Sequence, residues 1–428
     1  MTAPQLIILA GGASSRMWPL SEKSLLKFGE EPLLVTQLRT FARLGFRDVV
    51  VVGSPHNEAA VRALLPQLPA DLRVQVAVQP EPMGMGDAVL RAAPLVQADA
   101  AVYINQVHDI VEDSLHEAML HHHGTDSTRS YLAGVTLPTY FPGGYLIVEA
   151  DGRITGIVEK PGPGREPSPY VNIVAHVHAH AGRLFDAIRA EYARGLPSDD
   201  HYERAMDGLM KQHPYHVVRY EGRWDALKYP WHVLSVMERF LSRIEGQTIA
   251  SDVFIAPTAS ISGPVVIEAG AKIFAGAAVV GPSYIGRGVI VGNNALVRQS
   301  MVLARSNVGF TTEVARSYVG EGVQMHACRV LDSVFADRVN FSAGCTTANL
   351  RIDHGIVSSV IKGEKVTTGR DKLGAIIGAD AFLGVDVMTM PGVKIGAGAK
   401  IGPGTHVHQD VKDRARVYVK QTLVVHEE

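Results

Sequence analysis

The sequence predicts an α/β chain in two parts, a Rossmann-like mixed sheet followed by a left-handed parallel β-helix. Two observations predict this fold class. Strand-like and helix-like segments alternate over the first half, and apolar residues recur every six positions over the second. The length of 428 residues agrees, because a chain of this size exceeds one ordinary core and divides into two or three domains.

The first half has the pattern of repeated βαβ units. Short apolar runs alternate with segments in which apolar residues have helical spacing. This alternation favours a mostly parallel sheet that binds ligands at the carboxyl ends of its strands. The strand candidates are Leu6–Leu9, Val49–Val52, Val74–Val78 and Ala101–Ile104, and the helix candidates include Leu34–Leu44 and Glu58–Leu65.

The second half has a six-residue period. Each hexad can supply one flat side of a three-sided coil with its apolar residue pointing inward, and glycine suits the corners. A gap in the period from about 349 to 375 predicts a loop that leaves the coil. The expected inward positions are Ile255, Ile261, Ile267, Ile273, Val279, Ile285, Val291, Val297 and Leu303, then Ile377, Leu383, Ile395, Ile401 and Val407, with Thr389 as the one exception.

These patterns divide the chain into a sheet domain over residues 1–235, a connecting helix over 236–250, a β-helix over 251–413 and a C-terminal tail over 414–428. The connection is expected to be helical because apolar residues between 231 and 249 have helical spacing.

Composition narrows the class of protein. Hydrophobic residues make up 46% and charged residues 20%, which is typical of globular chains, and the net charge of −2 argues against nucleic acid as a partner. No apolar run approaches the ~20 residues that span a bilayer, so no membrane partner is expected. Two cysteines do not make a disulfide framework, and the first residues lack the basic n-region and small-residue cleavage site that are typical of a signal peptide. A cytoplasmic location is therefore expected.

The loop after the first strand candidate has the chemistry of an anion site. Its sequence, GGASSR over residues 11–16, combines glycines, hydroxyls and a guanidinium, and Lys23 follows. Glycines let backbone N–H groups approach phosphate oxygens, and Arg16 and Lys23 supply two positive charges that suit a triphosphate. A plain glycine-rich turn with two solvated cations is the alternative that the local sequence leaves open, and the Walker A spacing is absent.

The same stretch resembles the signature of the nucleotidylyltransferases that activate sugar 1-phosphates. In that family a glycine-rich loop ends in Arg and is followed by Pro-Leu and Lys-x-Leu-Leu. The matching pieces here are Gly11, Gly12, Arg16, Pro19-Leu20 and Lys23-Ser24-Leu25-Leu26. The resemblance covers essentially the whole chain. It is strongest to the bifunctional type that joins an N-acetylglucosamine-1-phosphate uridylyltransferase to an amino-sugar acetyltransferase on a hexapeptide β-helix.

The resemblance implies a reaction and a site. A sugar 1-phosphate attacks the α-phosphorus of an NTP, which gives an NDP-sugar and pyrophosphate; such a step needs alignment of two anions and neutralisation of charge. Arg16 and Lys23 would hold the triphosphate, and Lys160 the sugar phosphate. The implied nucleotide-binding residues are Ala10, Gly11, Gly12, Ser14, Ser15, Gln79 and Gly84, and the implied sugar-binding residues are Gly144, Glu159 and Asn172.

A Mg²⁺ held by two carboxylates is also implied, and here the sequence departs from the family. Val107 stands where the first metal-binding Asp is expected, with Asp109 two residues later, and Ala226 follows Asp225 at the second position. Asp109 and Asp225 are the expected ligands. If they are ordinary loop carboxylates, the alternative is a catalytically degenerate protein that binds sugar nucleotides or serves as a scaffold.

Histidines form a second candidate metal group. His176, His178 and His180 alternate, so they are expected on one face of a strand, where three histidines could bind Zn²⁺. A polar strand face with satisfied neighbours is the favoured interpretation.

The β-helix resembles the acetyltransferase half of the bifunctional type. The stretches VQMHACRVLDSV (323–334) and TTANLRIDHG (346–355) make His326 the candidate general base and Asn349 the matching amide, with acetyl-CoA as co-substrate. A near-neutral His can take a proton from an amine during acyl transfer. The resemblance also implies a homo-trimer through the β-helix. A β-helix kept only for assembly, or an acetyltransferase without the other activity, remains open.

Overall fold

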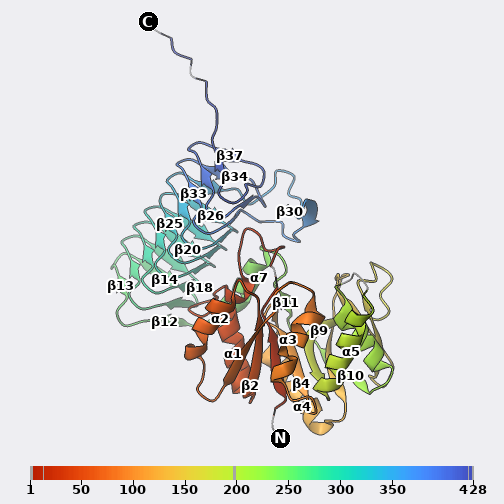
Figure 1. Ribbon diagram of the computed structural model, residues 1–428. Helices are drawn as coiled ribbons and strands as arrows, with labels where there is room; N and C mark the ends of the chain where they lie inside the picture. Colours follow the sequence, from red (N-terminus) through yellow and green to blue (C-terminus); the bar gives the residue numbers. More distant parts are fainter. Residues whose placement is uncertain (1–2, 13, 196–198, 423, 427–428) are drawn as a thin grey trace. The chain divides into compact units, whose positions relative to one another are not determined.

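The computed structural model describes residues 3–12, 14–195, 199–422 and 424–426. Its residues fall into two compact units, each described here by itself (Figure 1). The first unit comprises Met1–Ala13 and Leu33–Ala226, and the second comprises Ser14–Pro32 and Leu227–Glu428. None of the helices in the described ranges combines the length and the apolar character needed to cross a membrane.

The first unit is built on a mixed sheet. Its central strands are parallel, whereas β9 runs antiparallel to both of its neighbours, β4 and β6. A short antiparallel ribbon of β5 (Asp109–Ile110) and β11 (Asp225–Ala226) stands apart from it. The main order is β10 (Tyr215–Tyr220), β6 (Ser130–Thr136), β9 (Tyr170–His178), β4 (Val102–Gln106), β1 (Gln5–Leu9), β2 (Asp48–Gly53), β3 (Arg73–Val78), with β7 (Gly144–Val148) and β8 (Ile154–Glu159) added beside β9.

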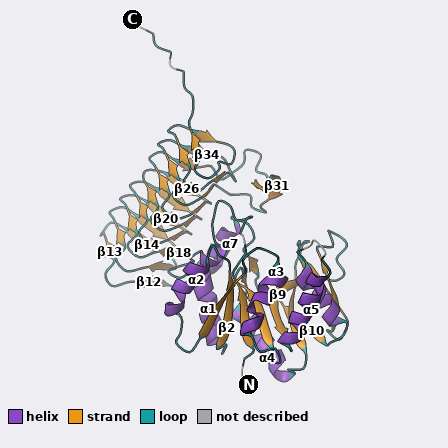
Figure 2. Cartoon of the chain, viewed as in Figure 1, coloured by secondary structure: helices purple, strands orange, loops and turns teal. Residues whose placement is uncertain are grey.

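Helices cover this sheet (Figure 2). Val89, Ile188 and Tyr202, from α3, α5 and α6, belong to one buried cluster with side chains of the sheet. Elsewhere Phe41 of α1 packs on His116 of α4, with ring centroids 4.7 Å apart. The helices are α1 (Leu33–Arg43), α2 (Glu58–Leu64), α3 (Met85–Ala92), α4 (Asp113–Thr125), α5 (Ala181–Ala193) and α6 (His201–Met210), with 3₁₀ turns at Leu65–Gln67 and Ala93–Leu95.

The predicted strands and helices of this half are confirmed within one or two residues at each end. The four strand candidates are β1 to β4, and the two helix candidates are α1 and α2. Residues 49–53 of β2 are all buried, as expected of a central parallel strand with both faces covered. β1 lies between β4 and β2, so the chain adds β2 and β3 on one side of β1 and β4 on the other, and the strand order reverses at β1. Ligands bind at the carboxyl ends of strands at such a reversal.

The second unit contains the left-handed parallel β-helix, whose three sides are three parallel sheets. Side A comprises β12 (Gln247–Ile249), β15 (Val265–Ile267), β18 (Ser283–Ile285), β21 (Met301–Val302), β24 (Tyr318–Val319), β27 (Val334–Phe335), β32 (Ile376–Ile377) and β35 (Lys394–Ile395). Side B comprises β13 (Phe254–Ile255), β16 (Lys272–Ile273), β19 (Ile290–Val291), β22 (Asn307–Val308), β25 (Gln324–Met325), β28 (Asn340–Phe341), β33 (Phe382–Leu383), β36 (Lys400–Ile401) and β38 (Arg416–Val417). Side C comprises β14 (Ser260–Ser262), β17 (Ala278–Val280), β20 (Leu296–Arg298), β23 (Glu313–Ala315), β26 (Arg329–Leu331), β29 (Thr346–Thr347), β34 (Met388–Thr389) and β37 (His406–Val407).

The six-residue period predicts the core of this β-helix with one error. The expected residues from Ile267 to Val297 are in one buried cluster, but Val302 replaces Leu303 in it. The cause is a shorter coil: the N–H of Ser300 donates to Oγ of Ser283, only 17 residues earlier, one fewer than three hexads. Thr389, the exception in the pattern, is fully buried.

Two further segments belong to the second unit. The connecting helix, expected within 236–250, is α7 (His232–Leu241), and residues 247–249 already form the first strand of side A. The gap in the hexads is confirmed as an excursion that carries the hairpin of β30 (Ser358–Ile361) and β31 (Glu364–Thr367). Lys394, 1% exposed, anchors this hairpin through Oγ of Ser359, and its ammonium also pairs with Asp410 at 2.6 Å.

Residues 14–32 lie along the β-helix. The indole N–H of Trp18 donates to Asp413 at 2.9 Å, and the hydroxyl of Tyr318 donates to the main-chain oxygen of Lys27 at 2.9 Å. Glu30 pairs with Arg287 at 2.7 Å. Since these partners belong to successively earlier coils, the segment runs along the β-helix against the direction in which the coils advance.

Candidate active sites

The glycine loop leaves β1 at Ala10 and is shaped by the end of β2. A Cβ on Gly11 would lie 2.5 Å from the main-chain oxygen of Gly53, so only glycine fits there, whereas Gly12 has open space around it. Asn57, fully buried, ties the two loops together. It accepts from the N–H of Ser54 at 2.8 Å and donates to the oxygen of Ala10 at 2.9 Å. Asn57 therefore positions the glycine loop, a role that no motif around it in the sequence predicts.

The loop with Gln79 and Gly84, two of the implied nucleotide-binding residues, follows β3 and is held by its own side chains. The amide nitrogen of Gln79 donates to the oxygen of Gly84 at 2.9 Å and to Asp87 at 3.0 Å. Both amide hydrogens of Gln79 are thus engaged, which leaves its oxygen, an acceptor, for any base it contacts. Gly84 adopts φ +93°, which favours glycine, and Tyr192 braces the loop by donating to the oxygen of Met83 at 2.7 Å.

The three predicted sugar-binding residues align across adjacent strands. Gly144 of β7 lies directly opposite Glu159 of β8, and the antiparallel ladder that pairs Tyr145 with Val171 places Asn172 of β9 on its other side. Neighbouring strands are ~4.8 Å apart, so Glu159 and Asn172 stand about 10 Å apart with no side chain between them. A Cβ on Gly144 would lie 3.3 Å from a Glu159 oxygen and would intrude on this slot.

Lys160 stands at the end of the slot. It has φ +46°, and its N–H donates to the oxygen of Gly143 at 3.1 Å, which turns the chain sharply after β8. Its ammonium pairs with Glu159 at 2.9 Å and is half exposed. A carboxylate, an amide and an ammonium therefore flank Gly144, a combination that suits a hydroxylated ligand carrying an anionic group.

Asp109 and Asp225 lie on paired strands but project from opposite faces of the ribbon. Asp109 is opposite Ala226, and Asp225 is opposite Ile110, so alternation places the two carboxylates on different faces. Their contacts agree: Asp109 accepts from the indole N–H of Trp224 at 3.1 Å, whereas Asp225 pairs with Arg223 at 2.8 Å. These two carboxylates do not fit a shared metal ion.

Other metal groupings find no support in the described ranges, where no cluster of three or more His, Cys, Asp or Glu side chains is suited to a metal. His176 and His178 are buried and hydrogen-bonded to tyrosines, and His180 lies beyond the end of β9. The polar-face interpretation of these histidines is therefore the one that the structure supports.

Arg16 and Lys23 belong to the segment that lies along the β-helix, whereas Ala10, Gly11 and Gly12 belong to the first unit. Arg16 is exposed and Lys23 is partly buried, at the start of a 3₁₀ turn over Lys23–Leu25. The predicted triphosphate-binding residues are therefore divided between the two units.

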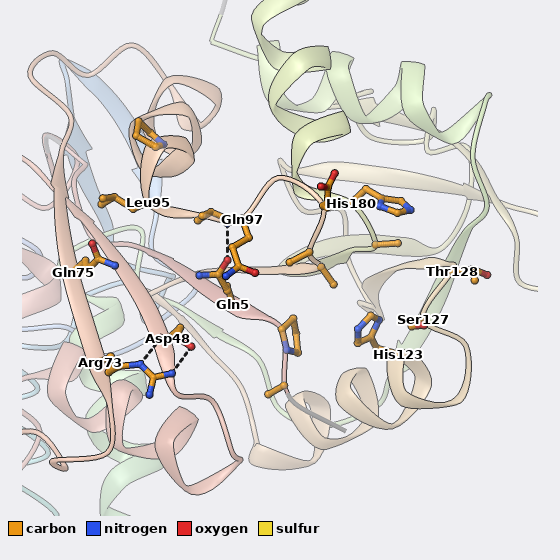
Figure 3. Close-up of a pocket in the computed structure, with 18 residues that line it drawn as sticks. Gln5, Asp48, Arg73, Gln75, Leu95, Gln97, His123, Ser127, Thr128 and His180 are labelled. Atoms are coloured by element: carbon orange, nitrogen blue, oxygen red, sulfur yellow. Dashed lines mark hydrogen bonds and ion pairs between the residues drawn. The ribbon is translucent and has the colours of Figure 1, made fainter.

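A broad pocket of about 1070 Å³ lies at the amino ends of the strands in the first unit (Figure 3). Gln5, Asp48 and Arg73, the first residues of β1, β2 and β3, line it, and a bidentate ion pair joins Arg73 to Asp48. Because ligands of such sheets bind at the carboxyl ends of the strands, this pocket is not the predicted site.

In the β-helix, His326 and Asn349 stand at different corners. His326 follows β25 of side B and is exposed, whereas Asn349 follows β29 of side C. The amide nitrogen of Asn349 donates to Asp332, which Arg316 also holds with two bonds of 2.7 Å. Side C of the β-helix lies between these two corners, so the structure does not bring His326 and Asn349 together within one chain.

Comparison with known proteins bears on both units. A family model described as nucleotidyl transferase matches residues 5–194, and one described as bacterial transferase hexapeptide (six repeats) matches residues 374–419. A bifunctional sugar-1-phosphate nucleotidylyltransferase/acetyltransferase from Sulfurisphaera tokodaii is 29% identical over 94% of this chain and 97% of its own length. The bifunctional protein GlmU of Methanococcus maripaludis is 30% identical over 98% of both chains. This chain belongs to the bifunctional GlmU family.

Membership of the GlmU family makes the chain a transferase with a nucleotidyltransferase part and a hexapeptide-repeat part. The predicted resemblance, fold class and enzyme class are confirmed at this level. Similarity extends over nearly the full length of each relative, so both parts are represented.

One residue near the slot was missed by sequence reasoning. Glu203, on α6, is partly buried. Burial, followed by the nearby charge of Glu159, raises the pKa of Glu203 to about 7, and Lys160 opposes the shift. Perturbed carboxyls of this kind gather at functional sites. In the sequence it is one of several charged residues in the α6 segment, with Arg204 beside it, and such residues are usually solvated.

Proposed function

We propose that this protein is a sugar-1-phosphate nucleotidylyltransferase that makes an NDP-sugar and pyrophosphate from an NTP and a hexose or amino-hexose 1-phosphate. The observation that carries the proposal is the slot at Gly144, with Glu159 and Asn172 on its two sides and Lys160 at its end. This arrangement offers hydrogen bonds to a sugar and a positive charge to its phosphate.

In the proposed reaction a phosphate oxygen of the sugar 1-phosphate forms a bond to the α-phosphorus of the NTP, and the bond to pyrophosphate breaks. Lys160 orients the attacking phosphate. Arg16 and Lys23 hold the triphosphate, together with the backbone from Ala10 to Gly12 and the hydroxyls of Ser14 and Ser15. Gln79 and Gly84 contact the base. Positioning and charge neutralisation supply the catalysis.

Mg²⁺ is the proposed metal, and when bound it supplies further neutralisation of phosphate charge. Because Asp109 and Asp225 project from opposite faces, we assign no step to an ion held by this pair. Mg²⁺ often binds through one carboxylate and substrate phosphates, so an ion that arrives with the NTP is consistent with this chain.

The test is pyrophosphate release with Mg²⁺ across a panel of NTPs and hexose 1-phosphates. Lys160→Ala should raise KM for the sugar phosphate at least tenfold with little change in KM for the NTP. Lys211→Ala is the matched control, because Lys211 is also an exposed lysine of the first unit paired with a carboxylate, Asp207 at 2.6 Å. No turnover with any pair would reject the enzyme in favour of a sugar-nucleotide-binding or scaffold protein.

Acetyl transfer is the second proposed activity. The amine of an amino-sugar 1-phosphate attacks the thioester carbonyl of acetyl-CoA, His326 accepts the amine proton, and the C–S bond breaks to release CoA. The exposed position of His326 at a corner of the β-helix supports the proposal. His326→Ala should abolish CoA release and keep pyrophosphate release, whereas His406→Ala, an exposed histidine of β37, should keep both.

Assembly is part of this second proposal. Because His326 and Asn349 stand at different corners of one β-helix, a homo-trimer through the β-helix is proposed, in the cytoplasm, where acetyl-CoA is available. Light scattering should give three times the 46.1 kDa of one chain. A monomer that still releases CoA would contradict the trimer and leave the activity standing.

A further inference from the structure

A continuous chain of hydrogen bonds runs from Asn172 into the core of the first unit. Nε2 of His176 lies 3.0 Å from Oδ1 of Asn172, and Nδ1 of His176 lies 2.9 Å from the hydroxyl of Tyr202. The same hydroxyl lies 2.9 Å from Nε2 of His178, whose Nδ1 lies 3.0 Å from the hydroxyl of Tyr215. Both histidines and both tyrosines are at most 3% exposed.

A β-bulge makes the first bond of this chain feasible. Asn172 and His176 are four residues apart on β9, a distance of roughly 13 Å along a regular strand. The register between β6 and β9 shifts between Leu132 and Ala133, which pair with His176 and Ile173. Two residues of β9 are therefore extra at this point. A bulge bends its strand and re-aims side chains, and here it brings the His176 ring to the Asn172 amide.

With Oδ1 of Asn172 facing His176, as the structure places it, one set of donors and acceptors satisfies every bond. Oδ1 accepts, so Nε2 of His176 carries the proton, and Nδ1 of a neutral His176 accepts from Tyr202. The single proton of Tyr202 is then used, so its oxygen accepts from Nε2 of His178. Nδ1 of His178 in turn accepts from Tyr215. Burial supports two neutral rings, because it lowers the pKa of His178 to about 3 and that of His176 well below its ordinary value.

The chain of hydrogen bonds ends at Ser130. The hydroxyl of Ser130 bonds to Tyr215, and its oxygen accepts from the N–H of Ala179 at 3.1 Å. Because Tyr215 gives its single proton to His178, its oxygen is left to accept from the Ser130 hydroxyl. Ser130 therefore completes the chain of hydrogen bonds that starts at Asn172.

We propose that Tyr202, His178 and Tyr215 are positioning residues that hold His176 as its Nε2–H tautomer and thereby fix the amide of Asn172 with its NH₂ as the donor toward the sugar phosphate. The inference rests on the proposed function in one respect, the role of Asn172 at the sugar slot. The relay selects a substrate that presents an acceptor oxygen, such as a hydroxyl or acetamido oxygen, at Asn172. A substrate with an ammonium group at Asn172 would be disfavoured, because the ammonium and the NH₂ of Asn172 are both hydrogen-bond donors.

The tautomers test the relay without any activity. In protein labelled with ¹⁵N-histidine, we expect His176 and His178 to show Nε2–H and unprotonated Nδ1 at neutral pH, with signals assigned through His176→Gln and His178→Gln. Nδ1–H tautomers or charged rings would overturn the relay. The measurement needs no substrate, so it shows whether the hydrogen bonds have the proposed directions even if the protein turns over no sugar phosphate. Failure of the relay can therefore be distinguished from failure of the proposed function.

Tyr202→Phe tests the consequence for the substrate. It removes the donor to His176 and the acceptor of His178, so KM for the sugar phosphate should rise about tenfold while KM for the NTP stays within about twofold. The matched control is Tyr103→Phe, because Tyr103 is also fully buried in the first unit and bonds to a buried histidine, His116, at 2.7 Å.

The comparison of the two variants separates positioning from stability. Tyr103→Phe loses one buried Tyr–His bond and Tyr202→Phe loses two, so both should lower the unfolding temperature. Only Tyr202→Phe should change KM for the sugar phosphate and disturb the His176 signal. Equal KM values in the two variants, or a parallel rise for both substrates in Tyr202→Phe, would show that the chain only stabilises the fold.

Discussion

Glu203 gives a pH dependence whose sign and size follow from its surroundings. Burial and the charge of Glu159 raise its pKa from the ordinary 4.5 to about 7 in the folded state. Between these values the folded protein keeps a proton that the unfolded chain has released. The contribution of Glu203 to the unfolding free energy is therefore largest below pH 4.5, falls as the pH rises toward 7, and stays at its lowest value above that.

The magnitude follows from the shift. A rise of the pKa from 4.5 to about 7, at ~1.36 kcal/mol for each tenfold change in proton affinity, changes the free energy of unfolding by up to about 3 kcal/mol. Glu203→Gln carries no titratable proton. The stability difference between the variant and the natural protein should therefore rise by up to about 3 kcal/mol from about pH 5 to pH 8. Subtracting the two curves cancels other groups, including His116, whose pKa burial lowers to about 4.

Urea unfolding at several pH values measures this difference. Glu117→Gln, at an exposed glutamate of α4, is the control for the effect of a Glu→Gln change itself. A flat difference curve for Glu203→Gln would refute the reasoning, because it would mean that burial and Glu159 do not raise the pKa of this carboxyl. The same ionisation should raise KM for the sugar phosphate above about pH 7, since a new negative charge near Lys160 opposes an anionic substrate.

Three further changes have defined outcomes. Asp410→Ala leaves the ammonium of the 1%-exposed Lys394 without its carboxylate and should cost about 3 kcal/mol in the unfolding free energy, measured by urea unfolding. Gly11→Ala places a Cβ 2.5 Å from a main-chain oxygen of β2 and should raise KM for the NTP about tenfold or more, whereas Gly12→Ala enters open space and should leave it nearly unchanged. Ala226→Asp adds a carboxylate on the face that carries the β5 carboxylate and should tighten Mn²⁺ binding about tenfold in calorimetry; unchanged binding would contradict the facing derived from the strand register.

The spacing of apolar residues predicted the strands and helices of this fold, because each of these elements forms from residues close together in the sequence. The strands β1 to β4 and the hexads needed only a count of apolar residues along a short window. The shortened coil at Ser300 was missed because the count assumed a constant spacing of six, whereas Ser300 bonds to Ser283 only 17 residues earlier. The position of residues 14–32 was missed because it depends on distant residues: Trp18 bonds to a carboxylate 395 residues away.

The candidate sites show the same division. Glycines and charges after the first strand identified the glycine loop as an anion site, because glycine lets backbone N–H groups approach phosphate. The residues of the slot at Gly144 followed only from the resemblance to the family. The relation of Asp109 to Asp225 depended on register, because a shift of one residue moves a side chain to the other face of a ribbon. A sequence can show that two carboxylates exist near two strand ends, but the pairing of those strands decides whether they meet.

β9 shows how one strand serves both the slot and the core. Its alternating histidines have the spacing of a metal-binding row, yet their partners are tyrosines from α6 and β10, and burial keeps both rings neutral. A neutral imidazole has one donor nitrogen and one acceptor nitrogen, so the role of one nitrogen determines the role of the other. The hydroxyl of Tyr202 links the two rings, and the hydroxyl of Tyr215 bonds to the second ring. The bulge then turns this row toward Asn172. If the proposed relay holds, the precision of the proposed sugar contact at Asn172 is set by buried groups that do not themselves reach the slot. Specificity in this unit should then change when the core is altered and the slot is left intact.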